Sequence, residues 1–110
     1  GGFDAGPSPY DLLASALGAC TTMTMRMYAD RKQLPLDRAM VEVRHGKVHI
    51  EATEGTADGT PTQIDRFERI ITLEGEGLTD ADRERIVSIA NRCPVHRTLG
   101  QGSTIDTVLR

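Results

Sequence analysis

The chain contains two cysteines, Cys20 and Cys93, which lie 73 residues apart in the sequence. This separation excludes a local C-x-x-C redox motif. If the fold brings the two thiols together in a mostly buried site, they would suit peroxide reduction. One thiolate would attack the O–O bond and become a sulfenic acid, and the second would condense with it to a disulfide that an external dithiol reduces. The spacing alone leaves open whether the two sulfur atoms meet.

The two cysteines occupy different sequence surroundings. Cys20 lies in an apolar, uncharged stretch, where a free cysteine usually behaves as a small buried hydrophobe. Cys93 directly precedes Pro94, so it could lie at a helix start with backbone N–H groups pointing toward its sulfur. Arg92 and Arg97 are close to it in sequence, and both helix N-termini and cations lower the pKa of a thiol. These surroundings shift weight toward a chemical role for Cys93, but simple helix punctuation remains the favoured interpretation of this cysteine taken alone.

Composition excludes several classes of function. The chain has 110 residues, of which 38% are hydrophobic, with 13 basic and 16 acidic residues and a formal net charge of −3. We expect no nucleic-acid partner, because phosphate binding needs a concentrated basic face. We expect no membrane partner, because no run of about 18 apolar residues is present. Two cysteines do not make a disulfide scaffold, so a cytoplasmic, reducing location is expected. The core is modest, and association with a second copy would help.

A long helix is predicted from Pro9 to Arg31. Ser8 can cap it through an S-x-x-D capping box, and proline suits the first helical position. No charged residue occurs between Leu12 and Met25. A helix without a polar face is buried on all sides, so we expect a central helix with Cys20 in its middle. Gly18 would let another element approach closely beside that cysteine.

The remaining pattern predicts an α+β fold with antiparallel strand pairing. The first predicted strand alternates along Ala39 to Ile50, a polar loop follows at 51–62, and the second strand covers Asp65 to Glu74. Thr79 is expected to cap a second helix that ends near Cys93, because Pro94 disfavours helix in the residue before it. The predicted elements after that are a short helix opened by Pro94 and a closing strand at 103–109.

Two motifs resemble those of the OsmC/Ohr family of osmotically inducible and organic hydroperoxide resistance proteins. Residues 6–13 read G-P-S-P-Y-D-L-L and residues 16–21 read A-L-G-A-C-T, similar to the start of the family's central helix. Residues 89–97 read I-A-N-R-C-P-V-H-R, similar to the family's second cysteine motif. The likeness covers essentially the whole chain and is greatest for the OsmC-like branch.

The resemblance implies an intertwined homodimer, with long central helices packed between sheets and the site at the subunit interface. It implies thiol-dependent reduction of organic hydroperoxides, with Cys20 as the peroxide-attacking cysteine and Cys93 as the resolving one. The implied reductant is an external dithiol of the lipoyl type, and no metal or other cofactor is expected. Residues 1–110 would form a single OsmC-like domain that lacks the family's N-terminal strands.

The sequence departs from the activated family pattern at two points. Tyr10 stands where activated members have a glutamate. Asp11 does not replace it, because nine residues of helix put it on the opposite side from Cys20 and about 13 Å along the axis. The family's activating arginine belongs to a strand absent from this sequence, and Arg26 and Arg97 are possible substitutes. These departures favour an alternative, a non-catalytic module that binds a small apolar ligand at the dimer interface, with both cysteines structural.

A second alternative is a metal-binding protein. Cys93 and His96 have the spacing of a ligand pair, to which Cys20, His45 or His49 would add further ligands. Zinc sites usually show two tight ligand pairs, and the sequence offers only one. We therefore interpret His96 as a polar residue of the short helix, and His45 and His49 as strand residues.

Overall fold

The α+β class predicted from the sequence is confirmed. The computed structural model describes residues 6, 8–50 and 62–110. In chain order, its elements are α1 (Pro9–Arg31), β1 (Arg38–Ile50), β2 (Thr62–Glu74), α2 (Asp80–Ala90) and α3 (Pro94–Gln101). The loop predicted between the strands lies at 51–61 outside the described residues, and Thr62 already belongs to β2. Among the described residues, no helix has the length and apolar character needed to cross a membrane.

Helix α1 has the bounds predicted from its sequence, because its start is fixed locally. The Ser8 hydroxyl accepts a hydrogen bond from the Asp11 backbone N–H at 3.1 Å, and the Asp11 carboxylate accepts one from the Ser8 N–H at 3.0 Å. This capping box satisfies N–H groups that have no partner inside the helix. Pro9 follows at the first helical position.

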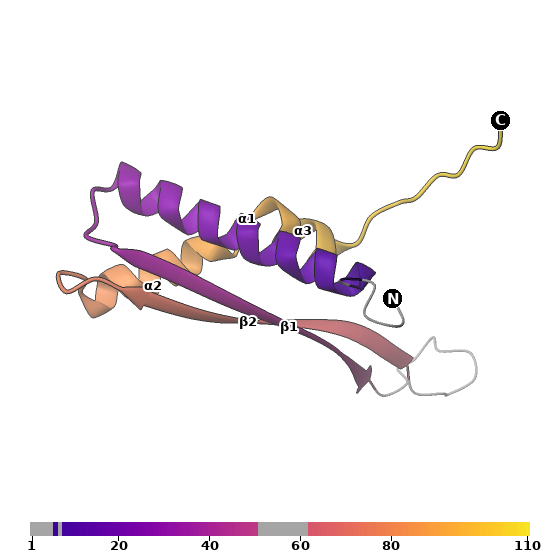
Figure 1. Cartoon of the computed structure of the whole chain (residues 1–110), viewed down its shortest axis with the longest axis horizontal. Coiled ribbons are helices and arrows are strands. Elements are labelled where there is room, and N and C mark those ends of the chain that lie inside the picture. The colour runs from indigo at the N-terminus through magenta and orange to yellow at the C-terminus, as the bar shows by residue number, and fades with distance from the viewer. Residues whose placement is uncertain (1–5, 7, 51–61) are drawn as a thin grey trace.

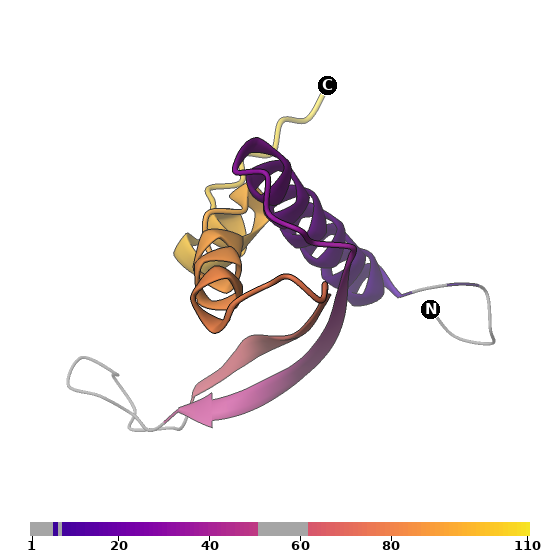
Figure 2. The same cartoon turned by 90° about the vertical axis from the view of Figure 1, so that its left-hand side faces the viewer.

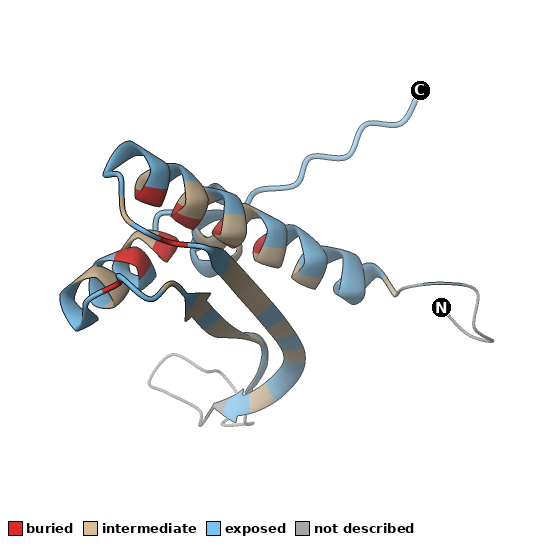
Figure 3. Cartoon of the chain, turned by 60° about the vertical axis from the view of Figure 1, so that its left-hand side comes forward, coloured by how far each residue is buried: buried red, intermediate tan, exposed pale blue. Residues whose placement is uncertain are grey.

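Burial of α1 on all sides is not found in this chain. Its fully buried residues recur every fourth position and form one stripe: Leu17, Thr21, Met25 and Ala29. On the rest of its surface Leu12, Met23 and Met27 are 58%, 64% and 69% exposed. The reason is that β1, α2 and α3 all pack along the same side of the helix, so the opposite side contacts solvent (Figure 3).

Strands β1 and β2 form an antiparallel two-stranded sheet, as predicted. The register pairs Val41 with Ile71 and His45 with Phe67. The pair makes a long twisted ribbon, with α1 crossing over one face and α2 and α3 lying beside α1 (Figures 1 and 2). Val41 and Val43 are half-buried while Glu42 between them is exposed, as expected for a strand with one covered face.

Helix α2 begins at the predicted cap and closes a small core. The Thr79 hydroxyl accepts from the Asp82 N–H at 3.0 Å, and the Asp82 carboxylate accepts from the Thr79 N–H at 3.1 Å. Fully buried Ile86 and Ala90 then face α1. The core cluster of buried residues is Met25, Ala29, Leu36, Leu78, Ile86 and Ala90. The chain bends sharply after α2, and α3 starts at Pro94 as predicted.

The predicted closing strand at 103–109 is wrong. Residues 102–110 have no strand structure and are exposed, with Ile105, Val108 and Leu109 at 87%, 78% and 96%. The apolar residues give this segment the propensity for a strand, but a strand also needs a neighbour to pair with. The segment leaves α3 in a direction away from the β1–β2 ribbon (Figure 1).

Candidate active site

Cys20 lies in the middle of α1, beside the buried stripe rather than in it. The next residue, Thr21, is fully buried, whereas Cys20 itself is half-buried. The Thr24 hydroxyl donates to the Cys20 carbonyl at 2.8 Å, one turn further along the helix. The Cys20 sulfur is therefore the more accessible of the two in this chain.

Cys93 is the N-cap residue of α3 and is completely buried. Two tight turns after α2 bring Cys93 to the start of α3. In these turns the Arg92 N–H donates to the Ile89 carbonyl at 2.9 Å, and the Cys93 N–H donates to the Ala90 carbonyl at 3.3 Å. The His96 backbone N–H donates to the Cys93 sulfur at 3.4 Å. The expectation that backbone N–H groups point toward this sulfur is confirmed.

The fold brings the two cysteines together. Both are free thiols, and a side-chain hydrogen bond between Cys20 and Cys93 contributes to the pKa of each. The contact arises where the first turn of α3 packs against the middle of α1. The backbone N–H of Val95 also acts on both sulfurs, so the pair shares the start of α3.

The two thiols ionise with different ease. Burial raises the pKa of Cys20, and the hydrogen bond with Cys93 raises it further. Burial also opposes ionisation of Cys93, but hydrogen bonds from Cys20, the His96 N–H and Thr21 outweigh it and lower the pKa of Cys93. These donors stabilise the thiolate more than the thiol. In the pair, Cys93 is the sulfur that carries the negative charge first.

Arg69 is the residue beside the thiols that the sequence interpretation missed. It comes from β2, and its Nη1 donates to the Thr21 hydroxyl at 3.2 Å and to the Ala90 carbonyl at 3.0 Å. Its Nη2 donates to the Asn91 side-chain oxygen at 2.7 Å. The sequence feature that could have identified Arg69 is its charge: it lies on the covered face of β2, between the apolar residues Phe67 and Ile71.

The two arginines considered from the sequence are used elsewhere or exposed. Arg26 Nη1 donates to the Leu36 carbonyl at 2.7 Å, and Nη2 reaches the Asp37 carbonyl at 3.4 Å. It therefore holds the connection between α1 and β1. Arg97 is exposed on α3.

The positions that depart from the family pattern have structural roles away from the sulfurs. The Tyr10 ring stacks on His45 with centroids 4.5 Å apart and an interplanar angle of 4°. The Asp11 carboxylate is engaged in the capping box at the start of α1. Neither side chain contributes to the pKa of Cys20 through the interactions that dominate it.

The histidines do not gather around Cys93. His45 bonds Asp65 through Nε2 at 2.9 Å, and His49 bonds Gln63 at 3.2 Å, both on the β1–β2 ribbon. His96 has a lowered pKa because of burial and the nearby charge of Arg69. Within 8–50 and 62–110, no group of three or more His, Cys, Asp or Glu side chains could hold a metal ion. The metal-binding alternative gains no support from this part of the chain.

A pocket of about 230 Å³ opens next to the thiol pair, between α1, β2 and α3. Two residues of its wall belong to the site already described: Arg69 binds Thr21, and the His96 backbone binds Cys93. The wall of the pocket combines apolar side chains with the Arg69 guanidinium and the His96 imidazole. Its residues are Leu17, Asp65, Phe67, Arg69, His96, Leu99 and Gly100.

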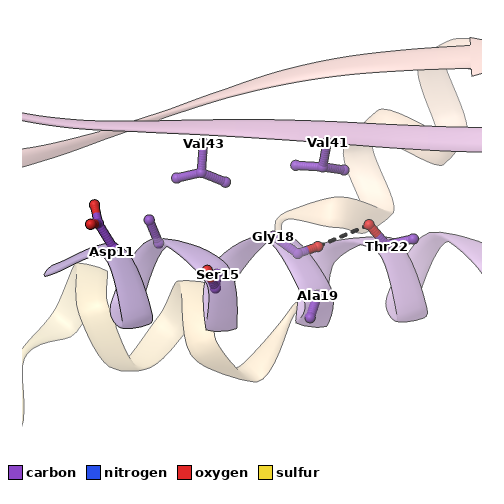
Figure 4. A pocket seen from close by; sticks show the side chains of 8 residues that line it. Asp11, Ser15, Gly18, Ala19, Thr22, Val41 and Val43 are labelled. Carbon is purple, nitrogen blue, oxygen red and sulfur yellow. Dashed lines mark hydrogen bonds between the residues drawn. The ribbon is translucent and has the colours of Figure 1, made fainter. Parts of the chain in front are cut away.

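A larger groove, of about 470 Å³, runs between α1 and β1. Val41 and Val43 point across it toward Gly18, and Asp11 lies at one end (Figure 4). A Cβ atom at Gly18 would lie 3.4 Å from a Val43 methyl carbon. The expectation that Gly18 permits a close approach is confirmed, and the approaching element is β1. The approach is not beside Cys20, because residues two apart on a helix point to opposite sides.

Comparison with known proteins identifies the family. The OsmC-like protein family matches residues 2–108. The chain belongs to this family. Uncharacterised proteins of Mycobacterium tuberculosis and Mycobacterium bovis are each 30% identical to it over 104 residues, which is 90% of this chain and 69% of theirs.

Solved structures of OsmC-like proteins share the fold. An OsmC-like hydroperoxide resistance protein from Jannaschia sp. CCS1 superposes with a TM-score of 0.71 at 24% identity, covering 98% of this chain and 69% of that one. An OsmC-like protein from Mycoplasma pneumoniae gives 0.60 at 23% identity, over 86% and 63%. The organic hydroperoxide resistance protein OsmC from Legionella pneumophila gives 0.55 at 20% identity, over 86% and 62%.

Proposed function

We propose that this OsmC-like protein is a thiol-dependent peroxidase that reduces organic hydroperoxides by a two-cysteine cycle. The observation that carries the proposal is the proximity of Cys20 and Cys93, two thiols 73 residues apart in the sequence whose side chains act on each other's pKa. Structural relatives named as hydroperoxide resistance proteins support the choice of substrate class. Such a cycle would serve defence against oxidative stress.

Accessibility and ionisation support different roles for the two sulfurs in this proposal. Cys20 is half-buried, so it is the sulfur a peroxide would meet first. Cys93 is fully buried and has the lowered pKa, so its thiolate is placed to take the proton of Cys20. Cys20 then acts as the attacking cysteine and Cys93 as its base and resolving partner.

The cycle balances in atoms and electrons. The Cys93 thiolate accepts the Cys20 proton, the Cys20 sulfur attacks the terminal peroxide oxygen, and the O–O bond breaks. The alkoxide takes the proton from Cys93 and leaves as an alcohol, and Cys20 is left as a sulfenic acid. The Cys93 thiolate then attacks the Cys20 sulfur, and hydroxide leaves and is protonated to water. An external dithiol, in this proposal of the lipoyl type, returns two electrons and two protons to the disulfide.

A homodimer would complete this arrangement. The side of α1 away from the core exposes Leu12, Met23 and Met27, which is unusual for apolar side chains on a single long helix. The radius of gyration is 17.9 Å, against about 13 Å for a compact chain of this length. Both features fit a chain that buries its remaining apolar surface against a second copy.

A second function, non-catalytic binding of a small apolar ligand, is favoured by one observation. The pKa of Cys20 is raised by burial, and the more accessible thiol is therefore the weaker nucleophile at neutral pH. In that case both cysteines would be structural, and the pocket beside them would hold the ligand.

Thiol counting separates the two functions. One equivalent of an alkyl hydroperoxide is expected to remove two free thiols from the wild-type protein, and a dithiol should restore both. The Cys20→Ser variant should show no rapid loss. Cys93→Ser, which lacks the base, should lose one thiol more slowly than wild type and keep a sulfenic acid that a dimedone-type reagent traps. Ser15→Ala, an exposed change on the same helix, is the control and should behave as wild type. Unchanged thiols in the wild type at neutral pH would refute the peroxidase and support the binding module.

A further inference from the structure

We propose that Arg69 is the positioning residue of the thiol pair. Its guanidinium binds α1 and the end of α2 at the same time, and it thereby fixes the distance between the two segments that carry Cys20 and Cys93. The inference rests on the proposed redox function only for the use that the protein makes of the thiol pair. The positioning of the two reduced thiols does not depend on that function.

The hydrogen bonds of Arg69 span the two segments directly. On one side Nη1 bonds the hydroxyl of Thr21, the residue after Cys20. On the other side Nη1 bonds the Ala90 carbonyl and Nη2 bonds the side chain of Asn91, both within three residues of Cys93. The planar guanidinium presents its donors in a fixed geometry, which makes it suited to holding three acceptors in one arrangement.

Arg69 has no competing ion pair that would explain its position. Across the described ranges it forms no salt bridge, and its donors go to two neutral side chains and one backbone carbonyl. A half-buried cation is costly unless its donors are satisfied. The two cysteine-bearing segments supply all three acceptors, so separating the segments would leave the guanidinium unsatisfied.

Thr21 connects Arg69 to the chemistry of Cys93. Its hydroxyl accepts from Arg69 and has a single proton to donate, which in this arrangement bonds the Leu17 carbonyl at 2.7 Å. Thr21 also lowers the pKa of Cys93, which places its hydroxyl within reach of that sulfur. A thiolate is a stronger acceptor than a carbonyl, so the proton is expected to turn toward Cys93 when that thiol ionises. Arg69 keeps the hydroxyl oxygen in place during this exchange.

The groups that face Cys93 come from three elements. Cys20 and Thr21 belong to α1, His96 to α3, and Arg69 of β2 lies behind Thr21. The pKa of His96 is lowered by burial and by the nearby charge of Arg69. Replacing Arg69 removes that charge and so acts on His96 as well, which is why the thiolate titration is read together with the rate of disulfide formation.

The test replaces Arg69 with methionine and with lysine, and uses Arg66→Met as the matched control. Arg66 is on the same strand, exposed, and pairs only with Glu68 among the described residues, at 3.1 Å. Two quantities are measured on folded protein: the ultraviolet absorbance of the thiolate as a function of pH, and the rate of intramolecular disulfide formation with a diamide-type thiol oxidant. The oxidant replaces peroxide, so failure of the peroxidase function would leave this test intact.

Arg69→Met is expected to move the thiolate titration to higher pH and to slow disulfide formation by about ten- to one-hundred-fold, the loss typical of a reacting group displaced by about 1 Å. The Arg69→Lys variant should give a titration and a rate between those of wild type and Arg69→Met, because lysine keeps the charge but lacks the forked donors of the guanidinium. Arg66→Met should match wild type. If Arg69→Met does not fold, Arg69→Lys carries the test alone, because it removes the forked donors of the guanidinium and keeps the charge. Wild-type titration and wild-type rate in a folded variant of either kind would overturn the inference.

Discussion

Shortening Ile86 to alanine should destabilise the protein far more than the same kind of change at its neighbour, Val87. Ile86 is 0% exposed and lies among the six buried residues that join α1 to α2, whereas Val87 is 44% exposed on the same helix. Truncating a buried isoleucine to alanine costs about 2–5 kcal/mol, and the cost is largest where neighbours cannot collapse into the space. Two of its neighbours, Ala29 and Ala90, are too small to fill a cavity, which places the expected loss in the middle of that range.

The comparison of the two variants removes the main confounding effect. Alanine has a higher helix propensity than either isoleucine or valine, by about half a kcal/mol in each case. That gain is common to both variants and cancels in the difference between them. We therefore expect Ile86→Ala to lose about 2–4 kcal/mol more than Val87→Ala, which corresponds to a difference in melting temperature of about 10 °C or more.

The assay is urea denaturation followed by circular dichroism, at one fixed protein concentration because association would shift the apparent stability. Equal slopes with different midpoints would show that stability alone has changed. Should the two variants unfold within about 0.5 kcal/mol of each other, the α1–α2 core described above would not be the main source of stability in this chain.

Three further predictions concern ionisation and packing. The rate of thiol loss with an alkyl hydroperoxide should rise with pH and level off at a lower pH than for an ordinary cysteine, because hydrogen bonding lowers the pKa of Cys93; a profile that rises only where free thiols ionise would contradict this. The hydrogen bond from His45 lowers the pKa of Asp65 in the folded protein. The interaction therefore stabilises the fold above the pKa that Asp65 has in the unfolded chain, and this stabilisation is lost as the pH falls through the folded-state pKa. Asp65→Asn should therefore weaken the acid dependence of the unfolding midpoint, and an unchanged dependence would count against the pair. Gly18→Ala should stabilise α1 by up to about 1 kcal/mol, since the added methyl meets Val43 at ordinary contact distance; a lower urea midpoint would mean that β1 needs the space.

The termini of the helices illustrate what sequence reasoning predicts well. Among the described residues, the capping boxes at Ser8 and Thr79 and the proline after Cys93 place the start of each helix where the structure has it. Each of these signals acts between residues three or fewer apart, so no distant contact is needed to satisfy it. The alternation that predicts β1 is similarly local, because it depends only on neighbouring residues of one strand.

Predictions that depended on distant neighbours were less successful. Residues 103–109 have an apolar pattern suited to a strand, but propensity cannot supply the pairing partner. The uncharged sequence of α1 correctly indicated a central helix, yet in this chain only the stripe through Leu17 and Ala29 is buried. How much of a helix is buried depends on which elements pack around it, and here they occupy one side.

The amino-acid sequence by itself determined the helix starts, the two paired strands of the described residues, the α+β class and the two cysteines as the residues capable of redox chemistry. Only the tertiary structure decided that the two thiols are in contact, that Cys93 ionises before Cys20, and that Arg69 joins their segments. The physical reason is that these features are contacts between α1, β2 and the α2–α3 turn, which are up to 73 residues apart. A thiol's pKa depends on the donors and charges around it in space, and these are assembled only when the helices pack.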